Sequence, residues 1–169
     1  MSDIVTISLA GAPRGKGRPR FRAVTTKSGQ HFNTAYTDSE TQKYEAALRA
    51  RAQDAMNGRP PLTGALRATI FAAFPIPASW SQKKQAQALK GIVRPTVKPD
   101  LDNIFKDLDA LNHVVFVDDS QIVEAIIRKV YSDRPRLTVE IEPVPMSILP
   151  HDNLLKKDDA PSLFEDASS

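Results

Sequence analysis

The stretch KPDLDNIFKDLDALN, residues 98–112, organises the chain and carries its densest chemistry. Pro99 disfavours helical geometry in the residue before it, so a helix can begin only after that point. From there, apolar residues recur every three or four positions, which predicts a helix over residues 100–112 with one buried stripe. The stripe consists of Ile104, Leu108 and Leu111. Two carboxylates, Asp100 and Asp102, stand at the start of this helix.

These two carboxylates have both an ordinary and a functional explanation. The dipole of a helix favours acidic residues in its first turn, so their presence there is routine. However, a second acidic pair, Asp118-Asp119, follows the short apolar segment 114–117, which is expected to be a strand that returns beside the helix start. Carboxylates gathered in one place repel one another unless a cation lies among them. Ligand sets made only of oxygen atoms favour Mg²⁺ or Mn²⁺ over zinc.

Two further details refine this hypothesis. Asp118 and Asp119 are adjacent, so in extended chain their side chains point to opposite faces and only one of them can face the site. The sequence does not decide which. Lys106 is four residues after Asp102, which places both on one helix face. It can form a surface ion pair there, or offset the charge of a phosphate in a transition state.

A second constellation lies near the N-terminus, where basic residues alternate with small, apolar or proline residues. Its members are Arg14, Lys16, Arg18, Arg20 and Arg22. Gly15 and Gly17 allow the backbone to approach a ligand closely. The segment is either a solvated basic loop or a phosphate-binding surface. A carboxylate cluster nearby favours the phosphate-binding surface, because a metal site acting on nucleic acid needs separate contacts to hold the polyanion.

The rest of the pattern mixes strands and helices without regular alternation. Strands are expected over residues 4–9, 66–74, 121–131 and 137–141. Helices are expected over residues 38–56 and 79–89. Each of these helices begins with a capping box, at residues 37–40 and 79–82 respectively. Residues 11–22 are expected to form a loop, 27–33 a turn, and 132–135 the connection of a hairpin. This order predicts an α+β domain over residues 1–143, with a mixed β-sheet packed against helices.

Composition limits the remaining options. The chain has 169 residues, 41% of them hydrophobic and 25% charged, which suits a single globular domain. It has no cysteine, which excludes disulfides, zinc-thiolate sites and a cysteine nucleophile. No signal peptide or membrane-length apolar run is evident, so a cytoplasmic protein without membrane contact is expected.

Charge is unevenly distributed. Residues 144–169 contain two basic and five acidic residues, and are expected to form an acidic, proline-containing, mobile tail. Residues 1–143 contain 21 basic and 15 acidic residues, a surplus that suits an anionic partner without requiring one.

The motifs resemble those of RusA-type Holliday junction resolvases. The resemblance is carried by KPDLDN (98–103), Lys106, DALN (109–112), VDDSQIV (117–123) and the basic loop, and it covers about residues 4–142. It implies a homodimeric, Mg²⁺-dependent endodeoxyribonuclease, with Mn²⁺ able to substitute, that resolves four-way DNA junctions by paired symmetric nicks in recombination and repair. It further implies a bacterial, phage or prophage setting and no small-molecule cofactor.

The same resemblance suggests roles for individual residues. Asp100, Asp102 and Asp119 match the metal-binding carboxylates and Lys106 the catalytic lysine, with Asp118 in support. Arg14, Lys16, Arg18, Arg20 and Arg22 match the DNA-binding loop. One departure is visible: two residues separate Lys106 from Asp109, where the family usually has three, which shortens or re-phases the helix after Lys106.

Two alternatives remain open from the sequence. The first is a related nuclease that prefers forked, flapped or other branched phage DNA. The second is a protein that binds DNA junctions without cutting them, in which the carboxylates only cap a helix.

Overall fold

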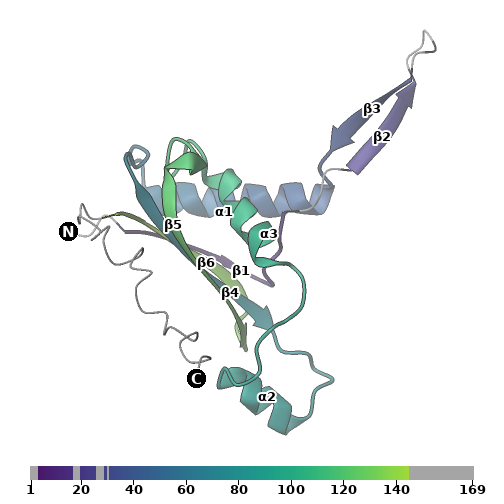
Figure 1. Cartoon of the computed structure of the whole chain (residues 1–169), viewed down its shortest axis with the longest axis vertical. Coiled ribbons are helices and arrows are strands. Elements are labelled where there is room, and N and C mark those ends of the chain that lie inside the picture. The colour runs from purple at the N-terminus through teal and green to yellow at the C-terminus, as the bar shows by residue number, and fades with distance from the viewer. Residues whose placement is uncertain (1–3, 17–19, 26–28, 30, 145–169) are drawn as a thin grey trace, which may run out of the picture.

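The computed structural model describes residues 4–16, 20–25, 29 and 31–144 of the chain (Figure 1). The predicted acidic tail therefore lies, apart from Val144, outside the described residues, as does Arg18. Within the described part, no helix is long and apolar enough to span a membrane.

A mixed four-stranded sheet forms the body. Its strands are β1 (Val5–Ala10), β6 (Arg136–Pro143), β4 (Leu66–Pro75) and β5 (Ile122–Ser132), in that spatial order. β6 runs antiparallel to both β1 and β4, whereas β4 and β5 are parallel. The predicted α+β class with a mixed sheet is confirmed.

The predicted hairpin of the last two strands is wrong. β5 and β6 are consecutive, but β4 lies between them in the sheet. β4 is the most apolar strand and is buried at alternating positions along its length. A strand of this kind gains most from the centre of a sheet, where both of its edges are hydrogen-bonded, so residues 133–135 cross its end instead of closing a hairpin.

Helix α1 (Ser39–Met56) lies across one face of this sheet (Figure 1). Its buried residues Leu48, Ala52 and Met56 recur at intervals of four and join the core with Val5 and Ile7 of β1. Asp38, and not the expected Thr37, caps the helix: its side chain accepts hydrogen bonds from the backbone N–H groups of residues 40 and 41. A carboxylate at this position satisfies donors that the helix itself leaves unpaired.

A second, two-stranded sheet projects away from the body (Figure 1). It consists of β2 (Arg20–Thr25) and β3 (His31–Tyr36), paired antiparallel. The expected loop over residues 11–22 therefore ends earlier, because its last three residues belong to β2 and pair with β3. Of the stretch 27–33, predicted as a turn, residues 31–33 begin β3, while 27, 28 and 30 lie outside the described residues.

Two short helices follow β4. α2 (Gln82–Leu89) is capped by Ser81, and not by Ser79 as expected, so Trp80 precedes the helix. α3 (Leu101–Phe105) continues directly as a 3₁₀ helix, η1 (Lys106–Leu111). The predicted buried stripe is confirmed, because Ile104, Leu108 and Leu111 are all buried.

The apolar segment 114–117 is not a strand, contrary to expectation. Phe116 forms only isolated bridges, to Leu62 and Asn112, while Val115 and Phe116 are buried in the core. The segment still returns the chain toward the helices, and it ends at a second 3₁₀ helix, η2 (Asp119–Gln121).

Candidate functional site

The start of α3 presents two exposed carboxylates. Asp100 occupies the N-cap position but its side chain makes no capping hydrogen bond. Asp102 lies in the first turn, where its carboxylate is 3.1 Å from the Lys106 ammonium. This hydrogen bond lowers the pKa of Asp102. Asp100 therefore does not cap its helix, in contrast to Asp38 at the start of α1.

Directly after α3, the chain tightens into the 3₁₀ helix η1. In a 3₁₀ helix, residues three apart lie directly above one another. The spacing of three between Lys106 and Asp109 therefore keeps both on one side of η1, and the same spacing keeps Leu108 and Leu111 buried. The tighter helix therefore continues the buried stripe that begins at Ile104 of α3.

Lys16 ties the N-terminal loop to this region. Its ammonium is 2.8 Å from a carboxylate oxygen of Asp109 and 3.5 Å from one of Glu45, which lies on α1. Its backbone N–H also donates to the carbonyl of Asn103, at 3.0 Å. Burial opposes the charge on Lys16, but the hydrogen bond to Asp109 and the two negative charges outweigh it and raise the pKa of the ammonium.

The structure separates the roles of Asp118 and Asp119. Asp118 is exposed and caps η2: its carboxylate accepts from the backbone N–H of Ser120 at 3.0 Å, and its own N–H donates to the side chain of Gln121. The hydrogen bonds from Ser120 lower the pKa of Asp118. Asp119 is half-buried, and burial together with the charges of Asp109 and Asp118 raises its pKa. Asp119 is therefore the member of the pair whose carboxyl group adjoins Asp109 of η1.

Asp107 is a buried carboxyl group that the sequence did not single out. It is 2% exposed, and neither of its oxygens has a hydrogen-bond partner within the described residues. Burial, and then the negative charge of Glu45, raises its pKa to about 8. Asp107 thus holds its proton near neutral pH, which limits the repulsion among the acidic side chains around it.

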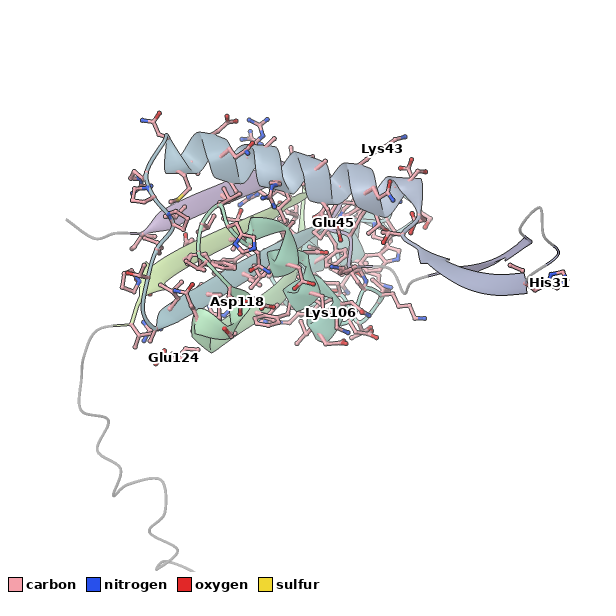
Figure 2. The ribbon with its side chains drawn as sticks, turned by 90° about the horizontal axis from the view of Figure 1, so that it is seen from above. His31, Lys43, Glu45, Lys106, Asp118 and Glu124 are labelled. Carbon is pink, nitrogen blue, oxygen red and sulfur yellow. The ribbon has the colours of Figure 1, made fainter. Side chains whose placement is uncertain are left out.

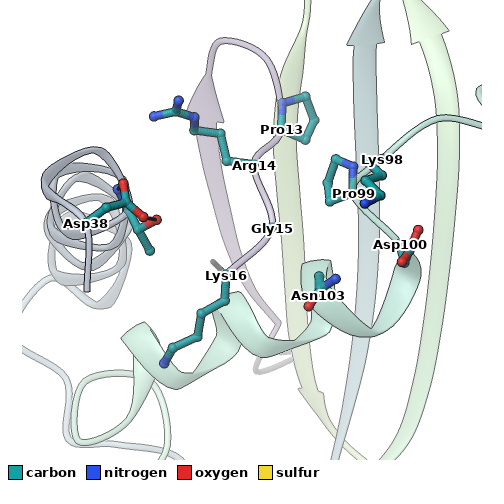
Figure 3. A pocket seen from close by; sticks show the side chains of 10 residues that line it. Pro13, Arg14, Gly15, Lys16, Asp38, Lys98, Pro99, Asp100 and Asn103 are labelled. Carbon is teal, nitrogen blue, oxygen red and sulfur yellow. Dashed lines mark hydrogen bonds between the residues drawn. The ribbon is translucent and has the colours of Figure 1, made fainter. Parts of the chain in front are cut away.

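An open groove of about 820 Å³ links the N-terminal loop to the start of α3 (Figure 3). Pro13, Arg14, Gly15 and Lys16 form one wall, and Lys98, Pro99, Asp100 and Asn103 the other, with Asp38 and Thr41 of the α1 start nearby. The two walls touch at Gly15: a Cβ atom there would lie 2.6 Å from Cβ of Pro99 and 2.8 Å from Cβ of Asn103. Only glycine fits this contact.

The N-terminal basic loop, through Arg14 and Lys16, and the start of α3, through Asp100, thus line one groove. The family model of endodeoxyribonuclease RusA matches residues 10–142. The chain belongs to the RusA endodeoxyribonuclease family. It is also 35% identical over 148 residues to the Uncharacterized protein YqaN of Bacillus subtilis (strain 168). The matched region covers 84% of this chain and 98% of YqaN.

The five predicted DNA-binding residues of this RusA-family chain are divided between two places. Arg14 and Lys16 line the groove, where Arg14 is 3.2 Å from Glu40 and Lys16 pairs with Asp109 and Glu45. Arg20 and Arg22 belong to the projecting strand β2, with Tyr36 and Thr34 as their cross-strand partners. Arg18 lies outside the described residues. The acids that neutralise the first two cations come from α1 and η1, far away in sequence.

Glu45 is the second residue that the sequence analysis missed. A signal for it exists: it follows Tyr44 and lies three residues before the buried Leu48, so it borders the packed stripe of α1. His31 stands near the end of the β2–β3 hairpin, remote from Lys106 and Asp118 (Figure 2). It is therefore not part of this site.

The carboxylates offer the ligand atoms that a hard divalent cation prefers, but their side chains are not gathered around one point. Asp100, Asp102 and Asp119 offer only oxygen ligands, the kind that Mg²⁺ and Mn²⁺ prefer. Among the residues that the structure describes, however, no three acidic or histidine side chains are gathered closely enough to hold an ion. Asp102 is instead paired with Lys106, and Asp119 adjoins Asp109.

Proposed function

We propose that this RusA-family protein is a Mg²⁺-dependent endonuclease that resolves four-way DNA junctions by paired, symmetric nicks. The observation that carries the proposal is the pair of exposed carboxylates at the start of α3, where Asp100 caps nothing and Asp102 contacts only a lysine side chain and its local backbone. Charged groups that the fold does not need, at the edge of a groove, are free for chemistry.

The proposed catalytic residues are Asp100, Asp102, Asp119 and Lys106. A divalent ion bound by the carboxylates would supply an activated water and offset charge on the leaving oxygen. Lys106 holds Asp102 in place at 3.1 Å and is exposed, so its ammonium can turn to a scissile phosphate. Asp118 supports the site by fixing the backbone that carries Asp119.

The proposed partner is branched DNA bound by a homodimer. Two copies related by a two-fold axis would present two equal groups of carboxylates, which matches the two-fold symmetry of a four-way junction. Arg14, Lys16, Arg20 and Arg22 are the proposed phosphate contacts. For Lys16, binding a phosphate means leaving Asp109 and Glu45, so DNA and these carboxylates compete for one cation.

The experiment is nicking of an end-labelled synthetic four-way junction, compared with a linear duplex of the same sequence. It is run with Mg²⁺, Mn²⁺ or EDTA, using the wild type and the Asp102→Asn variant. The proposal predicts paired symmetric nicks that need metal and are lost in the variant, while junction binding is kept. Tight junction binding without nicks in either metal would instead support a binding protein that does not cut.

The alternative substrate is tested in the same assay. Forks, flaps and three-way junctions of matched sequence are added as a panel. Faster cutting of any of these than of the four-way junction would assign the protein to other branched DNA intermediates. The non-catalytic alternative predicts that the α3 carboxylates cap their helix, and Asp100 does not.

A further inference from the structure

A strongly basic segment separates β4 from α3. Residues 76–99, here called the basic arm, contain five lysine or arginine residues and no aspartate or glutamate. The five are Lys83, Lys84, Lys90, Arg94 and Lys98, and all are exposed. None of them forms an ion pair with any described residue, whereas Arg14, Lys16 and Arg67 elsewhere in the chain all do.

The basic arm also exposes large apolar side chains. Leu89 is 56% exposed, Ile92 68% and Val97 52%. After α2 the chain folds back, with the N–H groups of Gly91 and Ile92 donating to the carbonyls of Ala88 and Gln87. Leu89 and Ile92 therefore belong to one compact turn at the end of the helix, here called the apolar tip. Exposed apolar residues surrounded by unpaired cations indicate a surface that a partner covers.

The basic arm is held firmly to the body at both of its ends. Near its start, the ring of Trp80 packs edge-on against Tyr131 of β5, with centroids 5.1 Å apart, and the Lys84 ammonium lies 3.8 Å above the Trp80 ring. Near its end, Lys129 of β5 donates to the backbone carbonyls of Val97 and Pro99. The arm is thus a fixed surface and not a loose loop.

The arm leads directly into the candidate site. Its last residues, Lys98 and Pro99, line the same groove as Asp100 and Arg14 (Figure 3). In Figure 1 it extends past the end of the sheet, on the opposite side of α3 from the β2–β3 hairpin. A polyanion lying across the carboxylates at the start of α3 would therefore meet basic residues on both sides of them.

We propose that the basic arm binds the branch point of the DNA: its cations contact phosphates and the apolar tip packs on bases that the branch leaves unstacked. This inference rests on the proposed function and adds to it the part of the protein that recognises branching. The cations supply affinity for any DNA, because phosphates carry no information on branching. Discrimination falls to Leu89 and Ile92, since a stacked duplex offers no base face to an apolar side chain and a branch does.

The first test compares affinities for a four-way junction and a linear duplex. Fluorescence anisotropy is measured in the Asp102→Asn background, so that no substrate is cut. The Leu89→Ser/Ile92→Ser variant is expected to lower the preference for the junction by about tenfold, the scale of burying one aliphatic side chain, and to leave duplex affinity unchanged. The matched control is Val123→Ser/Ile126→Ser, which removes two exposed apolar residues of β5.

The second test measures the contribution of the cations to binding separately from that of the apolar tip. The Lys90→Gln/Arg94→Gln variant is expected to weaken binding of both substrates alike, and to reduce the slope of log K against log salt concentration by about 0.9 for each cation lost. Its control is Lys43→Gln/Arg51→Gln, two exposed cations of α1 that already pair with acids. Loss of junction preference in the control variants, or its retention in the tip variant, would overturn the inference.

The outcomes also separate this inference from the function on which it rests. If the parent protein binds junction and duplex equally, the proposed function itself fails. If the parent discriminates and the tip variant discriminates as well, only the role of the tip fails. A tip variant that changes oligomeric state by sedimentation, with junction preference per protein unchanged, would show that a second copy of the chain covers the tip. Circular dichroism of each variant confirms that it is folded.

Discussion

Two consecutive segments of this chain differ sharply in charge. The basic arm, residues 76–99, has five cations and no acid, whereas residues 100–119, here called the acidic segment, have six aspartates and one lysine. The cations of the arm are exposed and unpaired within the described structure. The aspartates differ among themselves: one is buried, one caps a helix, and others face Lys16 or Lys106.

The contrast indicates a division of labour. An array of unpaired surface cations suits a partner with regularly repeated negative charge, because it needs no particular geometry. A cluster of carboxylates that differ in burial and partners suits chemistry, because each side chain meets different electrostatic conditions. The groove where Lys98 meets Asp100 is the boundary between the two.

The largest effect is expected within the acidic segment itself. Asp119→Asn should lower the single-turnover nicking rate of a four-way junction on the order of 10³-fold, because Asp119 is one of the three proposed metal-binding carboxylates. The neighbouring Asp118→Asn serves as the comparison, since Asp118 caps η2. Asparagine caps helices about as well as aspartate, so this variant should keep its folding stability and lower the rate far less. Equal rate losses in the two variants would remove the distinction between them.

Asp107 gives the second prediction, on stability and pH. Its pKa is about 8 in the folded protein and near 3.9 in an unfolded chain, so between these values the folded state binds more protons. The free energy of unfolding therefore falls as pH rises through this window. Asp107→Asn should leave stability at pH 4 almost unchanged and raise it at pH 9 by roughly 5 kcal/mol. Urea unfolding at several pH values measures this, and parallel curves for both proteins would contradict it.

The third prediction concerns Gly15, which packs against the chain where the basic arm meets the acidic segment. Gly15→Ala places a Cβ atom within 2.8 Å of both Pro99 and Asn103 and forces the walls of the groove apart. We expect a loss of about 2 kcal/mol in stability, as for other overpacked sites. Ala12→Ser, on the same loop at an exposed position, should have almost no effect. Thermal unfolding compares the two variants.

The smallest effect is expected at the anchor of the basic arm. Trp80→Leu removes the edge-on contact with Tyr131 and the ring beneath Lys84. These contacts contribute about 1 kcal/mol, so backbone amides of α2 should exchange hydrogen roughly fivefold faster. Trp80→Phe retains an aromatic ring and should exchange close to the wild-type rate. Unchanged exchange in Trp80→Leu would mean that the arm is held elsewhere.

Much of the architecture could be predicted from the sequence, because it follows from local periodicity. The buried stripe at Ile104, Leu108 and Leu111, the extent of α1 and the main strands all appear as regular apolar spacing. The order of strands did not appear, since the insertion of β4 between β5 and β6 depends on competition for the centre of the sheet. Local patterns carry no information on that competition.

The positions of the proposed site residues in the fold were partly predictable, but their pairings were not. The motif around Asp100 and Asp102 is continuous, so their shared position at a helix start followed from the sequence. The contact of Lys16 with Asp109 joins residues 93 positions apart, and Glu45 comes from a third element. Which of Asp118 and Asp119 caps η2 depends on backbone dihedral angles that the sequence does not reveal.

One measurement tests the division of labour most directly. Binding and single-turnover nicking of the same four-way junction are measured for Asp102→Asn and for Lys90→Gln/Arg94→Gln, the latter at saturating protein. The account predicts that Asp102→Asn binds but does not nick, and that Lys90→Gln/Arg94→Gln binds weakly but nicks at the parent rate once bound. If both variants lost binding and nicking to the same extent, the basic arm and the acidic segment would not have separate roles.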